Sequence, residues 1–142
     1  MVQIPKALAT LALTTLMTTA TAIGTATAEP GPDGRYYGSL AAGDLGDRFQ
    51  VTWALNYPNW ADSDNSALSR CESSTCTVLA RFVDGCGSIA QHNHRLLGGV
   101  GPTRADAERA ALDAFGPPDP ISLSAGNPPA SIAHTECTGN AG

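Results

Sequence analysis

Residues 48–57, RFQVTWALNY, alternate between two sets of side chains. The alternation places Phe49, Val51, Trp53, Leu55 and Tyr57 on one face and Gln50, Thr52, Ala54 and Asn56 on the other. A period of two is typical of a β-strand that buries one face and leaves the other in water. The preceding segment YYGSLAAG, residues 36–43, is predicted as its partner strand, with a hairpin turn at residues 43–46.

The period changes to that of a helix in two segments that resemble each other. PNWADSDNSAL from Pro58 and PTRADAERAAL from Pro102 align without a gap and share Pro, Ala, Asp, Ala and Leu at matched positions. Each predicts a helix start, because Asn59 and Thr103 are good N-caps and an aspartate follows each by three residues. In the second segment the helical spacing also produces an apolar stripe, made of Ala107, Ala110, Ala111, Ala114 and Phe115.

The similarity extends on both sides of the two predicted helices. YGSLAA precedes the first and CGSIAQ the second, and a strand-like segment follows each: CTVLARFVDGC, and ASIAHTEC beyond the loop GPPDPISLSAGNPP. Chance similarity is the alternative in an alanine-rich chain, but matched caps and flanks favour duplication. The prediction is an α+β fold of order β-β-α-β-β-α-β over residues 36–137, an antiparallel sheet with two helices on one face.

The first 28 residues have the pattern of a secretory signal peptide. Lys6 precedes an apolar run at residues 8–17, and small residues end at Ala26-Thr27-Ala28, so cleavage is predicted before Glu29. An uncleaved anchor is the alternative, but threonines interrupt the run before it could cross about 30 Å of hydrocarbon. The predicted location is therefore secreted or in the cell envelope, with a short disordered linker at residues 29–35 and a flexible tail at 138–142.

Four cysteines in an exported chain predict two disulfides, for which three pairings are possible. Loop-closure entropy does not choose among them, but the repeat does. Cys71 and Cys76 flank the loop after the first helix and have no counterparts after the second, so they are predicted to pair. Cys86 and Cys137 are then predicted to pair and to join the two halves. A Cys-x4-Cys metal knuckle and a free nucleophilic thiol are disfavoured by spacing and by the even count.

The charge balance limits the classes of partner. The chain has 8 Lys plus Arg and 13 Asp plus Glu, a formal net charge of −5, and its only lysine is Lys6. Nucleic acid and anionic lipid are both bound through basic patches, so neither is predicted as a partner.

Two segments contain candidate ligand-binding chemistry. QHNHR places His92 and His94 two residues apart, where two imidazoles could hold a metal, but no third ligand is evident and a hairpin tip explains them as well. GGVGPT resembles a phosphate cradle before a helix, but it lacks the Walker lysine, and close packing of strand and helix is the better account. No cofactor is predicted.

Aromatic residues supply a candidate binding surface. Tyr36, Tyr37, Tyr57 and Trp60 could form one exposed cluster near the start of the first helix. The structural alternative is that Trp60 only fastens this helix to the sheet.

These strings together resemble a known family. YYGSLAAG, Trp53 in the next strand, Cys71 and Cys76 after the first helix, GCGSIA and GPTRADAERAAL are similar to the secreted bacterial family called domain of unknown function 4189, from Tyr36 to Cys137. The resemblance implies a small exported disulfide-bonded domain without established enzyme activity, so no catalytic residue can be transferred. Phe115 stands where many members have another cysteine, and Asp64 replaces the alanine usual in the first helix.

The sequence therefore predicts an exported, disulfide-stabilised, non-catalytic interaction protein that binds another protein or a cell-envelope component. The absence of convergent polar motifs favours this function. The alternative is a small secreted hydrolase or metal-dependent enzyme that uses His92 and His94.

Overall fold

The computed structural model describes residues 29–141, so the predicted signal peptide at residues 1–28 lies outside the described part. The elements in chain order are β1 (Tyr37–Asp44), β2 (Phe49–Tyr57), α1 (Trp60–Ser69), β3 (Thr77–Val83), β4 (Cys86–His92), β5 (Arg95–Gly101), α2 (Arg104–Asp113), α3 (Pro120–Ser124) and β6 (Ser131–Cys137). All strand pairs are antiparallel. The strands form two sheets of three, in the orders β2-β1-β3 and β5-β4-β6.

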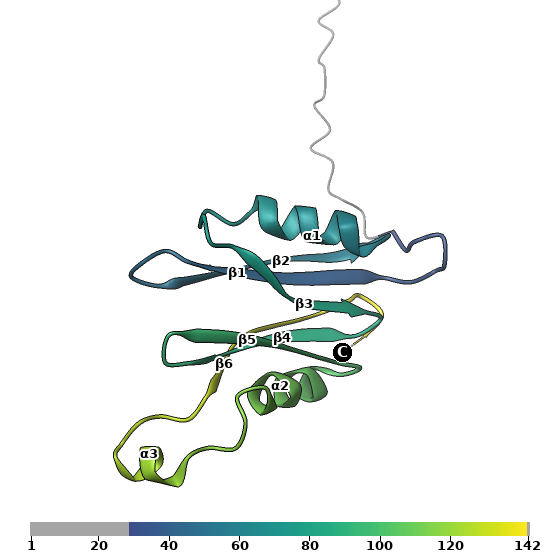
Figure 1. Ribbon diagram of the computed structural model, residues 1–142. Coiled ribbons are helices and arrows are strands. Elements are labelled where there is room, and N and C mark those ends of the chain that lie inside the picture. The colour runs from purple at the N-terminus through teal and green to yellow at the C-terminus, as the bar shows by residue number, and fades with distance from the viewer. Residues whose placement is uncertain (1–28, 142) are drawn as a thin grey trace, which may run out of the picture.

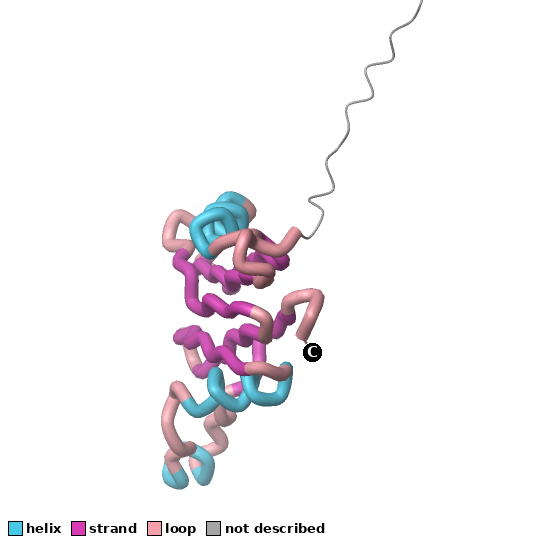
Figure 2. Tube along the Cα trace, turned by 90° about the vertical axis from the view of Figure 1, so that its right-hand side faces the viewer, coloured by secondary structure: helices cyan, strands magenta, loops and turns pink. Residues whose placement is uncertain are grey.

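The two sheets stack on each other, and each has a helix on its outer face (Figures 1 and 2). The α+β class and the antiparallel pairing are confirmed. The structure differs from the predicted single sheet with two helices on one face. The reason is that β3 returns to pair with β1 and β6 returns to pair with β4, so each half completes its own sheet.

The strand register supports the duplication. In the first half, Leu40 at the centre of β1 lies between Trp53 and Ala80, and in the second half Ile89 of β4 lies between Gly98 and His134. Leu40 and Ile89 are fully buried in one cluster between the sheets, together with Phe82. The glycines before them, Gly38 and Gly87, have no Cβ atom, and the ring of Phe82 occupies the space that each Cβ would need.

The alternation in β2 predicted a solvated face, and that prediction is wrong because α1 covers it. Thr52 and Ala54 are buried beneath the helix, and the Thr52 hydroxyl donates to the Ala67 carbonyl over 2.7 Å. Tyr57 also leaves its predicted face, because the register shifts at the end of the β1–β2 pair, where Asn56 has a φ of 63°. It packs under α1 with the Ala41, Ala54 and Ala67 cluster.

Both predicted helix caps are confirmed. The side-chain oxygens of Asn59 and Thr103 accept hydrogen bonds from the backbone N–H groups of Asp62, at 2.8 Å, and Asp106, at 3.2 Å. On α2 the buried side chains are alanines, Ala107 and Ala111, and they face the glycine-rich strand β5. Small residues on both sides let helix and sheet approach closely, as expected for the GGVG segment.

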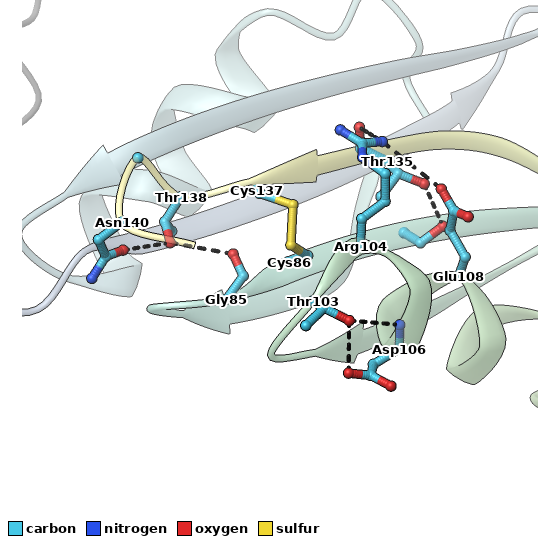
Figure 3. Close-up of a disulfide and its surroundings, with 12 residues drawn as sticks. Gly85, Cys86, Thr103, Arg104, Asp106, Glu108, Thr135, Cys137, Thr138 and Asn140 are labelled. Carbon is cyan, nitrogen blue, oxygen red and sulfur yellow. Dashed lines mark hydrogen bonds and ion pairs between the residues drawn. A yellow bond between two sulfur atoms is a disulfide. The ribbon is translucent and has the colours of Figure 1, made fainter. Parts of the chain in front are cut away.

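Both predicted disulfides are confirmed, but one of them has a different structural role. Cys71–Cys76 closes the loop between α1 and β3. Cys86–Cys137 links residues that face each other on neighbouring strands of the second sheet (Figure 3), so it does not join the two halves as predicted. The error arose because Cys86 is the first residue of β4, and not the last residue of the strand before it.

Hydrogen bonds also hold the two ends of the described chain. Within the predicted linker, Gly31 donates to the Arg35 carbonyl and the Tyr37 hydroxyl donates to Asp33 over 2.6 Å. In the predicted tail, Gly139 donates to the Asn56 side chain, and the Asn140 amide donates to Asp84. These tail contacts connect the end of the second half to the first half.

The close contact between Gly98 of β5 and Leu79 of β3 predicts a severe effect of Gly98→Ala. A Cβ at Gly98 would overlap the Leu79 carbonyl oxygen of β3 and lie 3.3 Å from the Ala80 methyl group. Because backbone must move to admit it, we expect the free energy of unfolding to fall by about 1–3 kcal/mol. Urea unfolding of the oxidised protein measures this.

The matched control is Gly139→Ala, whose Cβ would meet its nearest atom, the Asn56 side-chain oxygen, at 3.4 Å. We expect a change within about 0.5 kcal/mol. Equal effects of the two substitutions would contradict the proposed contact.

The two disulfides should differ in their contribution to stability. They enclose sequence separations of 5 and 51 residues. The chain-entropy relation gives about 2 kcal/mol for the short loop and about 4 kcal/mol for the long one. We therefore expect paired alanine substitution of Cys86 and Cys137 to lower the urea midpoint more than paired substitution of Cys71 and Cys76. The reverse order would contradict this prediction.

Candidate binding cleft beside the proline-rich loop

The two halves differ most in the connection between their helix and their last strand. In the first half, residues 70–76 join α1 to β3, and Cys71–Cys76 closes this short loop. In the second half, residues 114–130 join α2 to β6, and this segment contains α3 and projects away from the stacked sheets (Figure 1). The first half shows that the fold itself needs only the short connection.

The longer connection forms one side of a cleft of about 710 Å³. The lining is His92 from β4, Leu112 and Asp113 from α2, and the loop residues Phe115, Gly116, Pro117, Pro118, Asp119, Ser122, Leu123, Asn127, Pro128, Pro129 and Ala130. Eight of these fourteen residues have apolar side chains, and five have polar ones. This volume and composition are typical of sites that bind small molecules.

The walls of the cleft are held in a defined conformation. Proline fixes φ near −65°, so the pairs Pro117-Pro118 and Pro128-Pro129 restrict the loop at both ends. Between them, Asp119 caps α3: its Oδ1 accepts from the Ile121 N–H over 3.1 Å, and its Oδ2 accepts from the Ser122 hydroxyl over 3.0 Å. A preformed wall lowers the ordering cost of binding.

Phe115 connects the cleft to the β4–β5 hairpin. Its ring meets the ring of His92 edge to face, with 5.7 Å between centroids, and the guanidinium carbon of Arg95 lies 5.8 Å from the ring centre. The side chain is half-buried. At the position where the family resemblance suggested a cysteine, this chain therefore has an aromatic wall.

Two carboxylates line the cleft. Asp113 is exposed at the end of α2, and within residues 29–141 its side chain makes no hydrogen bond or ion pair. The Ile121 N–H, and after it the Ser122 hydroxyl, lower the pKa of the Asp119 carboxyl. Asp119 is therefore ionised at neutral pH.

The structure separates the histidines that were considered as metal ligands. His92 lines the cleft, whereas His94 is exposed in the turn after it, where Asn93 has a φ of 53°. His134 lies between the sheets, stacked on Trp53 at 4.3 Å and paired with Glu136 at 2.9 Å. In the part of the chain that the structure describes, no three His, Cys, Asp or Glu side chains are grouped to hold a metal ion.

Three of the four candidate aromatic residues lie together near the start of α1. Tyr37 faces Tyr57 across the strands, and its ring meets Trp60 edge to face at 5.2 Å. Their polar groups already have partners, since the Tyr57 hydroxyl donates to Ser66 and the Trp60 indole N–H donates to the Phe82 carbonyl. Tyr36 is fixed through its backbone N–H, which donates to Asp84. These contacts are those expected if Trp60 fastens α1 to the sheet, and a binding role stays a prediction.

Asp64 lies beside the packed face of α1. Its carboxylate accepts from the Ser39 hydroxyl over 2.5 Å and pairs with Arg81 over 2.7 Å. Because both oxygens have partners, the acid has a structural role here.

These features define a small disulfide-linked α+β domain made of two similar halves, with a cleft added to the second. The chain belongs to the family described as Domain of unknown function (DUF4189), whose sequence profile matches residues 37–137. The resemblance inferred from the strand, cysteine and helix motifs is thereby confirmed.

Curated relatives come from mycobacteria. Protein Rv1269c of Mycobacterium tuberculosis is 36% identical over 80 residues, which is 56% of this chain and 61% of the relative. Uncharacterized protein Rv1813c of the same organism is 33% identical over 78 residues, 55% of this chain and 52% of the relative. The chain thus spans between half and two thirds of the relatives it matches. No solved structure shows a significant match to it.

Sequence reasoning treated GPPDPISLSAGNPP as a plain loop and so missed the cleft. The available signal was its length relative to the first copy, together with the proline pair at each end. It could not reveal that α3 and Phe115 face a common space, because this depends on how the loop folds back on α2.

The cap on α3 predicts that the cleft wall depends on pH. Because the folded-state pKa of Asp119 lies below its usual value of 3.8, its ionised form stabilises α3 above about pH 4. This stabilisation is lost as the pH falls through the folded-state pKa. We expect the Ile121 amide signal to shift in NMR spectra, and its protection against hydrogen exchange, relative to an unfolded chain at the same pH, to fall in acid.

Asp119→Asn is the control, because its amide oxygen can accept the Ile121 N–H bond at every pH. Its Ile121 signal should not show the acid transition. A transition of equal size in this variant would contradict the assignment to Asp119.

Proposed function

We propose that this protein is an exported, non-catalytic binding protein that takes an apolar group of its ligand in the cleft beside the proline-rich loop. The observation that carries the proposal is the comparison between the two halves. The first half closes its helix-to-strand connection with residues 70–76, whereas the second half uses residues 114–130, which form one side of a cleft of about 710 Å³. A feature that the fold does not need is a candidate for function.

The two disulfides support export. Disulfides persist in oxidising compartments and are rare in the cytosol, and all four cysteines are paired. The signal-peptide pattern of residues 1–28 points the same way. Among the described residues, no helix has the length and apolar character needed to cross a membrane.

One observation favours the competing enzymatic function, since His92 and two carboxylates line the same cleft. The contacts within the cleft favour binding over catalysis. The Ser122 hydroxyl donates to Asp119 and not to a histidine, and His92 packs against Phe115. His94, the second residue of the proposed catalytic pair, is exposed in the turn.

Binding can be tested by NMR on isotope-labelled, oxidised protein titrated with phenylpropanol, a neutral probe with an apolar body. We expect saturable shifts of amides in the Leu112–Phe115 segment and in α3, with dissociation constants in about the millimolar range expected for such small probes. Phe115→Ala should weaken binding because it removes an aromatic wall.

Trp60→Ala is the matched control, because it removes an aromatic ring from the other candidate surface. It should leave the cleft shifts unchanged. Shifts centred on Tyr37 and Trp60, or equal binding by the Phe115→Ala variant, would contradict the cleft as the binding site.

A loop exchange tests the comparison of the halves directly. Replacing residues 116–130 with a short Gly/Ser linker shortens the connection toward that of the first half. We expect the amide spectrum of the first sheet to be retained and probe binding to be lost. Retention of binding in a folded loop variant would overturn the proposal.

A further inference from the structure

We propose that the cleft selects a small organic cation, namely a ligand with an apolar body and an ammonium or guanidinium group. This inference rests on the proposed function, because it assigns the chemistry of the ligand that the cleft binds. It follows from the apolar surfaces, the two carboxylates in the lining and the absence of arginine and lysine from it.

The apolar surfaces define the body of the ligand. Leu112, Phe115 and Leu123 come from three different parts of the second half and line one space with the proline pairs. Leu123 is 44% exposed, which is high for a leucine, so its apolar surface remains available. A volume of about 710 Å³ accommodates a drug-sized molecule.

The carboxylates define the charge of the ligand. Asp113 and Asp119 are in the lining, and no arginine or lysine is. Asp113 makes no hydrogen bond or ion pair within the described residues. Asp119 accepts two hydrogen bonds at one side, but a carboxylate offers about four acceptor positions, so it can still meet a donor. The net charge of −5 also attracts cations to the protein.

Two basic side chains lie against Phe115, the aromatic wall of the cleft. His92 contacts the edge of the Phe115 ring, and Arg95 lies over that ring. Neither makes an ion pair with Asp113 or Asp119. A cationic ligand group therefore has two carboxylates to approach, whereas an anionic group would meet both of them with no arginine or lysine in the lining to compensate.

The test compares three probes that share one apolar body: phenylpropylamine, phenylpropanol and phenylpropionate. Each is titrated by NMR into the oxidised protein at pH 8 and low salt. We expect the amine to bind about fivefold or more tightly than the alcohol, and the acid to bind more weakly than either.

Variants that replace an aspartate with neutral asparagine test whether Asp113 and Asp119 cause the tighter binding of the amine. Asp113→Asn and Asp119→Asn should each weaken amine binding about two- to fivefold and change alcohol binding by a smaller factor, since asparagine preserves shape and can still cap α3. The control is Asp47→Asn, which removes an equally negative, exposed side chain from the β1–β2 turn in the first half. This control variant should bind the amine and the alcohol as tightly as the unchanged protein does.

The outcomes separate the inference from the function on which it rests. Equal binding of amine and alcohol, with both weakened by Phe115→Ala, would overturn the charge selection and leave the binding cleft standing. Tightest binding of the acid would overturn the inference in the same way. If no probe binds, both the ligand class and the proposed function fail.

Discussion

The packing of Phe82 between the two sheets is the contact on which the remaining architecture depends. Its ring lies against Gly38 of the first sheet and Gly87 of the second, at equivalent places in the two copies, and it is 3% exposed. Leu40 and Ile89, which lie two residues after these glycines on β1 and β4, complete the buried contact. Neither disulfide crosses between the sheets, so this apolar layer, the turn at Asp84 and Gly85, and the tail contacts hold the halves together.

The two halves place different side chains at one matched position that faces the layer between the sheets. On one side Gly98 has no side chain, and β5 approaches β3 closely. The equivalent position in the first half is Trp53, which stacks on His134 of β6 and therefore separates the strands on the opposite side. The second half also contains the longer loop with α3 and the cleft. The two halves share one frame, and the second half contains the features that point to binding.

The family relationship identifies the domain, and the geometry adds a candidate binding site within it. Membership in the DUF4189 family covers residues 37–137 and identifies the domain. The contacts around Phe115, Asp113 and Asp119 concern only the loop in the second half, and they support a ligand-binding cleft there.

Local interactions made much of the fold predictable. The caps at Asn59 and Thr103, the β1–β2 hairpin and both disulfide pairings follow from neighbouring residues and from the repeat. Two sheets in place of one, the burial of Thr52 under α1 and the placement of Cys86 and Cys137 in one sheet depend on which distant strands pair. The cleft depends on such contacts too, since His92, Phe115 and the proline pairs converge only after β6 returns to β4. Sequence periodicity reports the faces of an element, but long-range strand pairing decides what covers each face.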